Sequence, residues 1–128
     1  MYYDEQCNFD KLKGKIVTEI KGCKVGSDEI RFICNDGSEY LMYHVQDCCE
    51  SVTLEDIAGD VNDLINSEIM LAEEVTSNEN PEGVKPEYQD SFTWTFYKLR
   101  TINGSVTLRW YGESNGYYFE SVDFAKLK

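Results

Sequence analysis

Two runs in which apolar and polar residues alternate constrain the fold of this chain more than any other feature. The runs are Ser91–Thr101 and Ser105–Gly112, and Ile102-Asn103-Gly104 joins them. Alternation with a period of two is typical of a strand with one buried face, and Asn-Gly is a preferred loop of two-residue hairpins. We therefore expect an antiparallel hairpin whose loop is formed by Asn103 and Gly104.

A loop at those two residues would place Leu99 opposite Leu108 on the buried face and Lys98 opposite Arg109 on the other. The second face would carry three cations and three aromatic rings, which are Trp94, Phe96, Lys98, Arg100, Arg109 and Tyr111. Like charges directly opposite each other are unfavourable unless an anion lies over them. A small anionic signalling nucleotide, with its phosphate on the cations and its base on a ring, would fit this face. The alternative is that acidic side chains of a neighbouring strand, such as Glu73, neutralise the cations.

The remaining apolar patterns predict further strands and one helix. Strands are expected over Lys15–Lys24, Glu29–Cys34, Glu39–Val45, Glu68–Thr76 and Tyr117–Phe124. Apolar residues from Leu54 to Ile65 recur at helical spacing, and Thr53 is the expected N-cap. The sequence therefore predicts one α+β domain over residues 1–128, in which the amphipathic helix Leu54–Asn66 packs on an antiparallel sheet of six to seven strands.

Acidic residues dominate the middle of the chain. The formal net charge is −12, from 24 Asp or Glu and 12 Lys or Arg. No Lys or Arg occurs between Arg31 and Lys85, whereas 13 acidic residues do. Such a surface repels nucleic acid and anionic membranes, and it attracts cations or basic proteins. The simpler alternative is that these acids form a solvated surface that keeps the protein in solution.

The sequence also indicates the cellular compartment in which the protein is expected. Its first residues lack the charged, apolar and small segments of a signal peptide, and no apolar run is long enough to cross a bilayer. The five cysteines are an odd number, which favours reduced thiols over a disulfide framework. We therefore expect a cytoplasmic protein.

One short segment contains side chains of types that bind metals. His44, Asp47, Cys48, Cys49 and Glu50 lie within seven residues, and imidazole, thiolate and carboxylate groups together can hold Zn²⁺ or Fe²⁺. However, the usual Cys-x-x-Cys spacing is missing, and adjacent cysteines on an extended chain point to opposite sides. A metal-dependent enzyme at this segment is therefore an alternative, and the leading expectation includes no metal or other cofactor.

Three segments of the chain resemble a known family. They are His44–Glu50 (HVQDCCE), Ala72–Val75 (AEEV) and Thr93–Asp123, which contains RWYGESNGYY. These segments are similar to an uncharacterised family of small proteins encoded by bacteriophages and prophages, and the similarity extends from Tyr40 to Phe124. The resemblance implies a viral protein that works in the bacterial cytoplasm. Small accessory proteins of phages often bind and block host machinery, including defence systems.

Charge and resemblance together predict a non-enzymatic inhibitor that binds a basic bacterial host protein. The acids expected to pair with Lys and Arg of that partner lie on the predicted helix and the strand after it: Glu55, Asp56, Asp60, Asp63, Glu73 and Glu74. Their spacing would imitate the charge pattern of a nucleic acid, as an anti-CRISPR protein does. Direct binding of nucleic acid or of a membrane is not expected. The alternative from another class is a sponge for a signalling nucleotide on the face of cations and aromatic rings.

Overall fold

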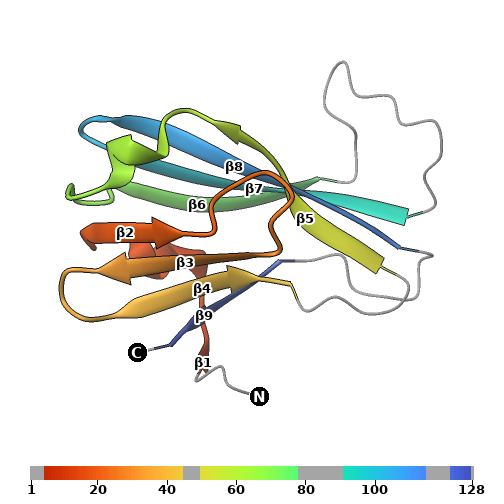
Figure 1. Cartoon of the computed structure of the whole chain (residues 1–128), viewed down its shortest axis with the longest axis horizontal. Helices are drawn as coiled ribbons and strands as arrows, with labels where there is room; N and C mark the ends of the chain where they lie inside the picture. The colour runs from red at the N-terminus through yellow and green to blue at the C-terminus, as the bar shows by residue number, and fades with distance from the viewer. Residues whose placement is uncertain (1–4, 45–49, 78–90, 115–121, 128) are drawn as a thin grey trace.

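The protein is a sandwich of two antiparallel β-sheets. The computed structural model describes residues 5–44, 50–77, 91–114 and 122–127. The five-stranded sheet has the order β1 (Glu5–Gln6), β9 (Asp123–Lys126), β4 (Glu39–Tyr43), β3 (Glu29–Cys34) and β2 (Val17–Lys21). The four-stranded sheet has the order β5 (Glu50–Ala58), β8 (Gly104–Ser114), β7 (Ser91–Thr101) and β6 (Leu71–Ser77). Figure 1 shows the sheets as two layers, with β6, β7 and β8 in one and β2, β3, β4 and β9 in the other.

The inner faces of the two sheets enclose one hydrophobic core. Fully buried side chains from both sheets line it, among them Phe32, Met42, Leu54, Tyr97 and Trp110. Side-chain hydrogen bonds also join the layers: the Trp110 indole donates to the Met42 thioether over 3.2 Å, and the Tyr97 hydroxyl donates to the Val122 carbonyl over 3.3 Å. Because the burial of one large apolar side chain contributes roughly 1.5–3 kcal/mol, this core is the main source of stability.

The expected α+β fold is wrong. The described residues contain no α-helix, and the segment Leu54–Asn66, predicted as a helix, begins within the strand β5 and continues into a 3-10 helix, η2 (Val61–Leu64). A second 3-10 helix, η1 (Phe9–Leu12), precedes β2. The strands also divide between two sheets instead of forming the single sheet of six to seven strands that the sequence predicted. No helix among the described residues is long and apolar enough to span a membrane.

A β-bulge in β5 explains why the sequence resembled a helix. Glu55 and Asp56 together lie opposite the single residue Arg109 of β8, so β5 contains one extra residue at this point. Leu54 before the bulge and Ile57 after it both face the core, paired with residues of β8 that do the same. The bulge therefore separates two inward-facing residues by three positions, and a spacing of three is also that of a helical stripe.

The predicted β7–β8 hairpin forms with a different register. Ile102-Asn103 is the turn, and Gly104 is already the first residue of β8. Lys98 consequently lies opposite Thr107, so the predicted pairing of Lys98 with Arg109 is wrong. The displacement relative to the predicted pairing is two residues, and a strand has a period of two. Every side chain of the hairpin therefore keeps its predicted face.

Contacts with η2 account for the position of Gly104. A Cβ atom on Gly104 would lie 2.6 Å from a carboxylate oxygen of Asp63. The Thr101 hydroxyl donates a hydrogen bond to the Asp63 carbonyl over 2.5 Å, and the Asn103 side-chain amide donates to the Ser67 hydroxyl over 2.7 Å. The glycine thus permits a close approach between the hairpin tip and η2.

Backbone hydrogen bonds from loops cover two edges of the sandwich. The Gly26 N–H donates to the Leu54 carbonyl over 2.7 Å, and the Leu54 N–H donates to the Ser27 carbonyl over 2.8 Å, so the β2–β3 loop covers β5. On β2, the Val17 carbonyl accepts from the Asn66 N–H over 2.8 Å. At the other edge of the four-stranded sheet, β6 pairs with β7 alone among the described strands, and η1 lies beside it.

Gly59, which follows β5, tests this strand assignment. Its φ is +104°, and an added Cβ atom would overlap the Ser105 carbonyl oxygen of β8. We expect Gly59→Ala to lower the free energy of unfolding by roughly 2 kcal/mol or more in chemical denaturation. Gly14→Ala is the matched control, because Gly14 has a φ of +87° but open space around its Cβ position. That control should lose about 1 kcal/mol, and equal losses would contradict the packing of Gly59 against β8.

Candidate functional site

The six acids predicted to bind a partner do not form one surface. Two of them lie on β5, two on β6 and two in or beside η2: Glu55, Asp56, Glu73, Glu74, Asp60 and Asp63. Because β5 and β6 are the two edge strands of the four-stranded sheet, β8 and β7 separate their acids. A partner that meets the acids of one edge therefore does not meet those of the other through the same contact.

Three of these acids have partners within the chain. The Glu55 carboxylate accepts hydrogen bonds from Arg109, over 2.9 Å from Nε and 2.5 Å from Nη2. Asp60 caps η2, where its side chain accepts from the Asn62 N–H over 2.9 Å. Asp63 packs against Gly104 at the tip of the β7–β8 hairpin. Reversing the charge of Asp60 or Asp63 would disturb the fold itself, so these two residues are poor probes of partner binding.

The structure places all six residues of the predicted nucleotide site on one face. They are Trp94, Phe96, Lys98, Arg100, Arg109 and Tyr111, and we call the outer surface of β7 and β8 that carries them the cation–aromatic face. The Arg109 guanidinium lies 5.0 Å from the centroid of the Trp94 ring and is ion-paired with Glu55. The Trp94 side chain is only 2% exposed. One of the three cations and one of the three rings that a nucleotide would use are therefore engaged within the chain.

The predicted metal site falls mostly outside the described residues. Asp47, Cys48 and Cys49 lie outside them, as does the side chain of Glu50, whereas His44 is buried at the end of β4. Among the residues that the structure describes, no three His, Cys, Asp or Glu side chains come together as a metal site would require.

Two of the three thiols that the structure describes are poor nucleophiles. The described cysteines are Cys7, Cys23 and Cys34, and none of them forms a disulfide with another described cysteine. Burial raises the pKa of Cys23 to about 11, and burial likewise raises the pKa of Cys34. A thiol attacks as its thiolate, so these two groups are protonated and unreactive at neutral pH.

A groove lies between β6 and η1. It has a volume of about 280 Å³, and Asn8, Phe9, Asp10, Ala72, Glu73 and Glu74 line it. We call it the β6–η1 groove. Its floor is apolar, because the Phe9 and Ala72 side chains are both buried. Three of its six lining residues are acidic, so the groove joins an apolar floor to a carboxylate rim.

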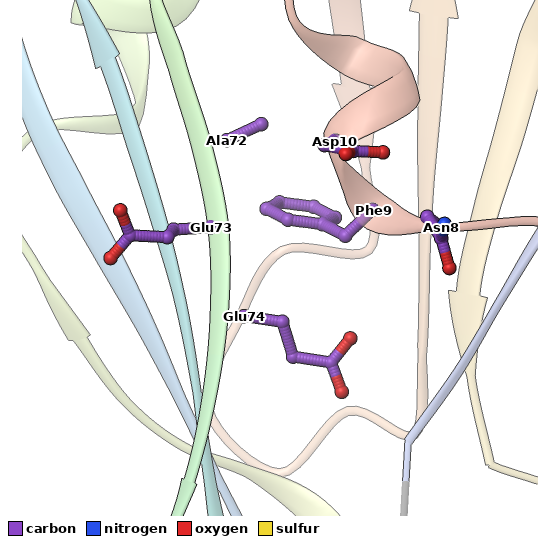
Figure 2. Close-up of a pocket in the computed structure, with 6 residues that line it drawn as sticks. All are labelled: Asn8, Phe9, Asp10, Ala72, Glu73 and Glu74. Carbon is purple, nitrogen blue, oxygen red and sulfur yellow. The ribbon is translucent and has the colours of Figure 1, made fainter.

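The two glutamates of the groove point in opposite directions from β6. Figure 2 shows Glu74 extending to the side of the strand on which the Phe9 ring lies, and Glu73 extending to the opposite side. This follows from the alternation of side chains along a strand. Glu74 therefore belongs to the inner face of the four-stranded sheet, beside Tyr97, whereas Glu73 belongs to the outer face, across from Lys98.

The inner glutamate is held in an environment that disfavours its charge. Partial burial and, second, the nearby Asp123 carboxylate raise the pKa of Glu74. Burial also raises the pKa of Asp123, while the positive charge available at His44 opposes that change. Burial and then these two carboxylates raise the pKa of the Tyr97 hydroxyl. Burial therefore disfavours the charges of both Glu74 and Asp123, and the Asp123 carboxylate further disfavours that of Glu74.

The sequence identified only part of this groove. Glu73 and Glu74 were among the predicted binding residues, but Asn8, Phe9 and Asp10 were not, because they lie outside the stretch without cations. One local signal was present. Phe9 and Leu12 are apolar residues three positions apart with charged residues between them, which is typical of a single helical turn that packs on one side.

The raised pKa of Glu74 predicts how stability depends on pH. The pKa of Glu74 is raised in the folded chain, so its contribution to stability is present below the unfolded value of about 4.5 and is lost as the pH rises through the folded value. We expect Glu74→Gln to raise the thermal unfolding temperature at neutral pH, and this gain to vanish toward the ordinary pKa of glutamate. Circular dichroism melts at several pH values measure it. Glu73→Gln makes the same change of net charge, and an equal gain in that control would contradict the assignment.

Comparison with known proteins places the chain in a family without assigning an activity. A family model described as a domain of unknown function, DUF7448, matches residues 10–124, which include β2 to β8 and the acids of the groove. No curated protein and no solved structure matches the chain. Because the matched region covers most of the 128 residues, the chain belongs to the DUF7448 family.

Proposed function

We propose that this protein is a non-enzymatic binding protein that recognises a basic bacterial protein through the β6–η1 groove. The observation that supports this most directly is the composition of the groove, in which an apolar floor of Phe9 and Ala72 lies beside the carboxylates of Asp10 and Glu74. A lysine or arginine side chain has the same two parts. Its methylene stem packs on apolar surface and its charged end binds carboxylates, so one such side chain of the partner matches the groove.

The acids of the groove are available for an external cation. The ion pairs among the described residues join Lys15 to Asp36, Lys21 to Glu19, Arg31 to Glu39 and Arg109 to Glu55. None of these pairs involves Asp10, Glu73 or Glu74. A partner cation would also relieve the repulsion between Glu74 and Asp123, because a positive charge nearby favours the ionised form of both.

The overall charge supports the same class of partner. A net charge of −12 attracts a basic protein over a longer range than the groove itself and raises the rate of encounter. The resemblance to phage and prophage proteins suggests a phage-encoded inhibitor in the bacterial cytoplasm. Its target would be a host protein whose basic surface normally contacts nucleic acid, for instance one of a defence system.

A pair of charge reversals on β6 tests the proposal. We expect the protein carrying Glu73→Lys and Glu74→Lys to retain basic proteins from a bacterial lysate at least tenfold less than the unchanged protein, a loss of about 1.4 kcal/mol. Capture by the unchanged protein should fall as the salt concentration rises, because salt screens exposed charges. Affinity capture with quantitative mass spectrometry measures both effects.

The matched control reverses two exposed acids elsewhere. Glu19→Lys on β2 and Asp56→Lys on β5 make the same change of net charge at exposed residues that do not line the groove. Unaltered capture by this control would attribute the loss to the groove. An equal loss in both pairs would show that only net charge matters, and it would contradict a localised site. Capture that is insensitive to salt and to all four reversals would reject the proposed function.

A further inference from the structure

The hydrogen bonds of β7 determine which backbone groups of β6 point out of the sheet. The Arg100 carbonyl accepts a hydrogen bond from the Met70 N–H over 2.7 Å, so the backbone groups of Arg100 face β6. The hairpin agrees, because Thr101 and Gly104 close a two-residue turn and therefore face each other. Along a strand in an antiparallel sheet, the N–H and C=O groups of successive residues point alternately to one neighbouring strand and to the other. Every second residue of β7 therefore bonds to β6. Their partners on β6, which bond to β7 in return, are Leu71, Glu73 and Val75.

Among the described strands, none other than β7 pairs with β6, so the remaining residues of β6 form an edge of the sheet. The N–H and C=O groups of Ala72, Glu74 and Thr76 point away from β7, and no described residue bonds to them. From Glu73 to Thr76 four successive residues are exposed, so both faces of the strand are uncovered there. A strand with unpaired backbone groups and uncovered faces is a template for pairing with another chain.

We propose that an extended basic segment of the partner adds to β6 as a fifth strand of the four-stranded sheet. This inference rests on the proposed function, because it specifies how the same groove is occupied. The backbone of the segment bonds to the open groups of Glu74 and Thr76, and its side chains alternate between the two faces. A cationic side chain on the inner face reaches Glu74 and Asp10 over the Phe9 ring, and one on the outer face reaches Glu73.

The acids of β6 decide which strand can occupy this edge. In a pairing of two copies of the chain through β6, the Glu73 and Glu74 side chains of both copies would lie close together, and like charges across a ladder repel. Charged side chains on an edge strand are a common guard against such pairing. A segment with lysine or arginine at alternate positions converts the same charges into attraction. The edge therefore selects a basic strand and rejects a second copy.

Proline at position 76 separates strand addition from simple charge attraction. Thr76→Pro removes an N–H that points to the open edge, and proline is tolerated on an edge strand at such a position because no bond of the ladder is lost. Thr76→Ala is the matched control, since it shortens the side chain and keeps the N–H. The probe is a short synthetic peptide that alternates lysine with valine, and fluorescence anisotropy measures its binding. We expect Thr76→Pro to bind the peptide about tenfold more weakly than Thr76→Ala.

Hydrogen exchange of the unchanged protein gives a second measurement that does not depend on any variant. The Glu74 and Thr76 amides should exchange freely in the free protein and become protected when the peptide is added. The Glu73 and Val75 amides bond to β7 and should be protected in both states, which makes them an internal control. The same peptide with glutamate in place of lysine should neither bind nor protect.

Several results would overturn strand addition. These are equal binding by the two Thr76 variants, no gain of protection at Glu74 and Thr76, or no binding of the lysine peptide at all. Protection that rises with protein concentration in the absence of peptide would show that a second copy occupies the edge, and it would also overturn the inference. In each case a loss of lysate capture by the protein carrying Glu73→Lys and Glu74→Lys would still support the proposed function. Strand addition and the proposed function can therefore fail separately.

Discussion

The Phe9 ring packs at an angle against Tyr97 of the four-stranded sheet and against Phe124 of the five-stranded sheet, with ring centroids 4.6 Å and 5.3 Å apart. Aromatic pairs in such edge arrangements contribute about 0.5–1.5 kcal/mol beyond their burial. The 3-10 helix η1 has only four residues, and a helix this short is not stable by itself. The packing of Phe9 therefore holds η1 beside β6, and the groove between them exists because the core extends into it. The same ring closes the interior and forms the apolar floor of the site.

The acids around that floor destabilise the fold, and in the proposed function the same acids favour binding. Glu74 and Asp123 have raised pKa values, which means that their charges destabilise the folded chain at neutral pH. Neutral side chains at these positions would be more stable, and sites that bind partners commonly keep such unfavourable groups. In the proposed strand addition, the charge of Glu74 also opposes pairing of β6 with a copy of itself. A single glutamate would thus cost stability, guard the edge of the sheet and favour a partner of opposite charge.

The alternation in the β7 and β8 sequences predicted the faces of the hairpin correctly, even though its turn lies one position earlier than Asn103-Gly104 suggested. The reason is that a displacement by two residues preserves the faces of a strand, so Trp94 and Arg109 remain on the outer side. The prediction of a helix over Leu54–Asn66 failed because β5 contains one extra residue. The bulge at Glu55 and Asp56 changed the spacing of inward-facing residues, and a bulge depends on the neighbouring strand, which the local sequence does not contain. Asp10 and Glu74 belong to one site because of how the sheets pack, and their separation in sequence concealed it.

Net charge and the open edge act at different stages of binding in this scheme. Electrostatic attraction extends over roughly 8 Å at physiological ionic strength, it is not directional, and it brings many basic surfaces toward the protein. Backbone hydrogen bonds at Glu74 and Thr76 act only at contact, and they require an extended segment in one register. Charge by itself would make the protein bind basic surfaces without discrimination. The edge adds the geometric requirement, and the groove at its inner face adds a position for one cationic side chain. Specificity in such a small domain then arises from the combination, because each element alone is common among protein surfaces.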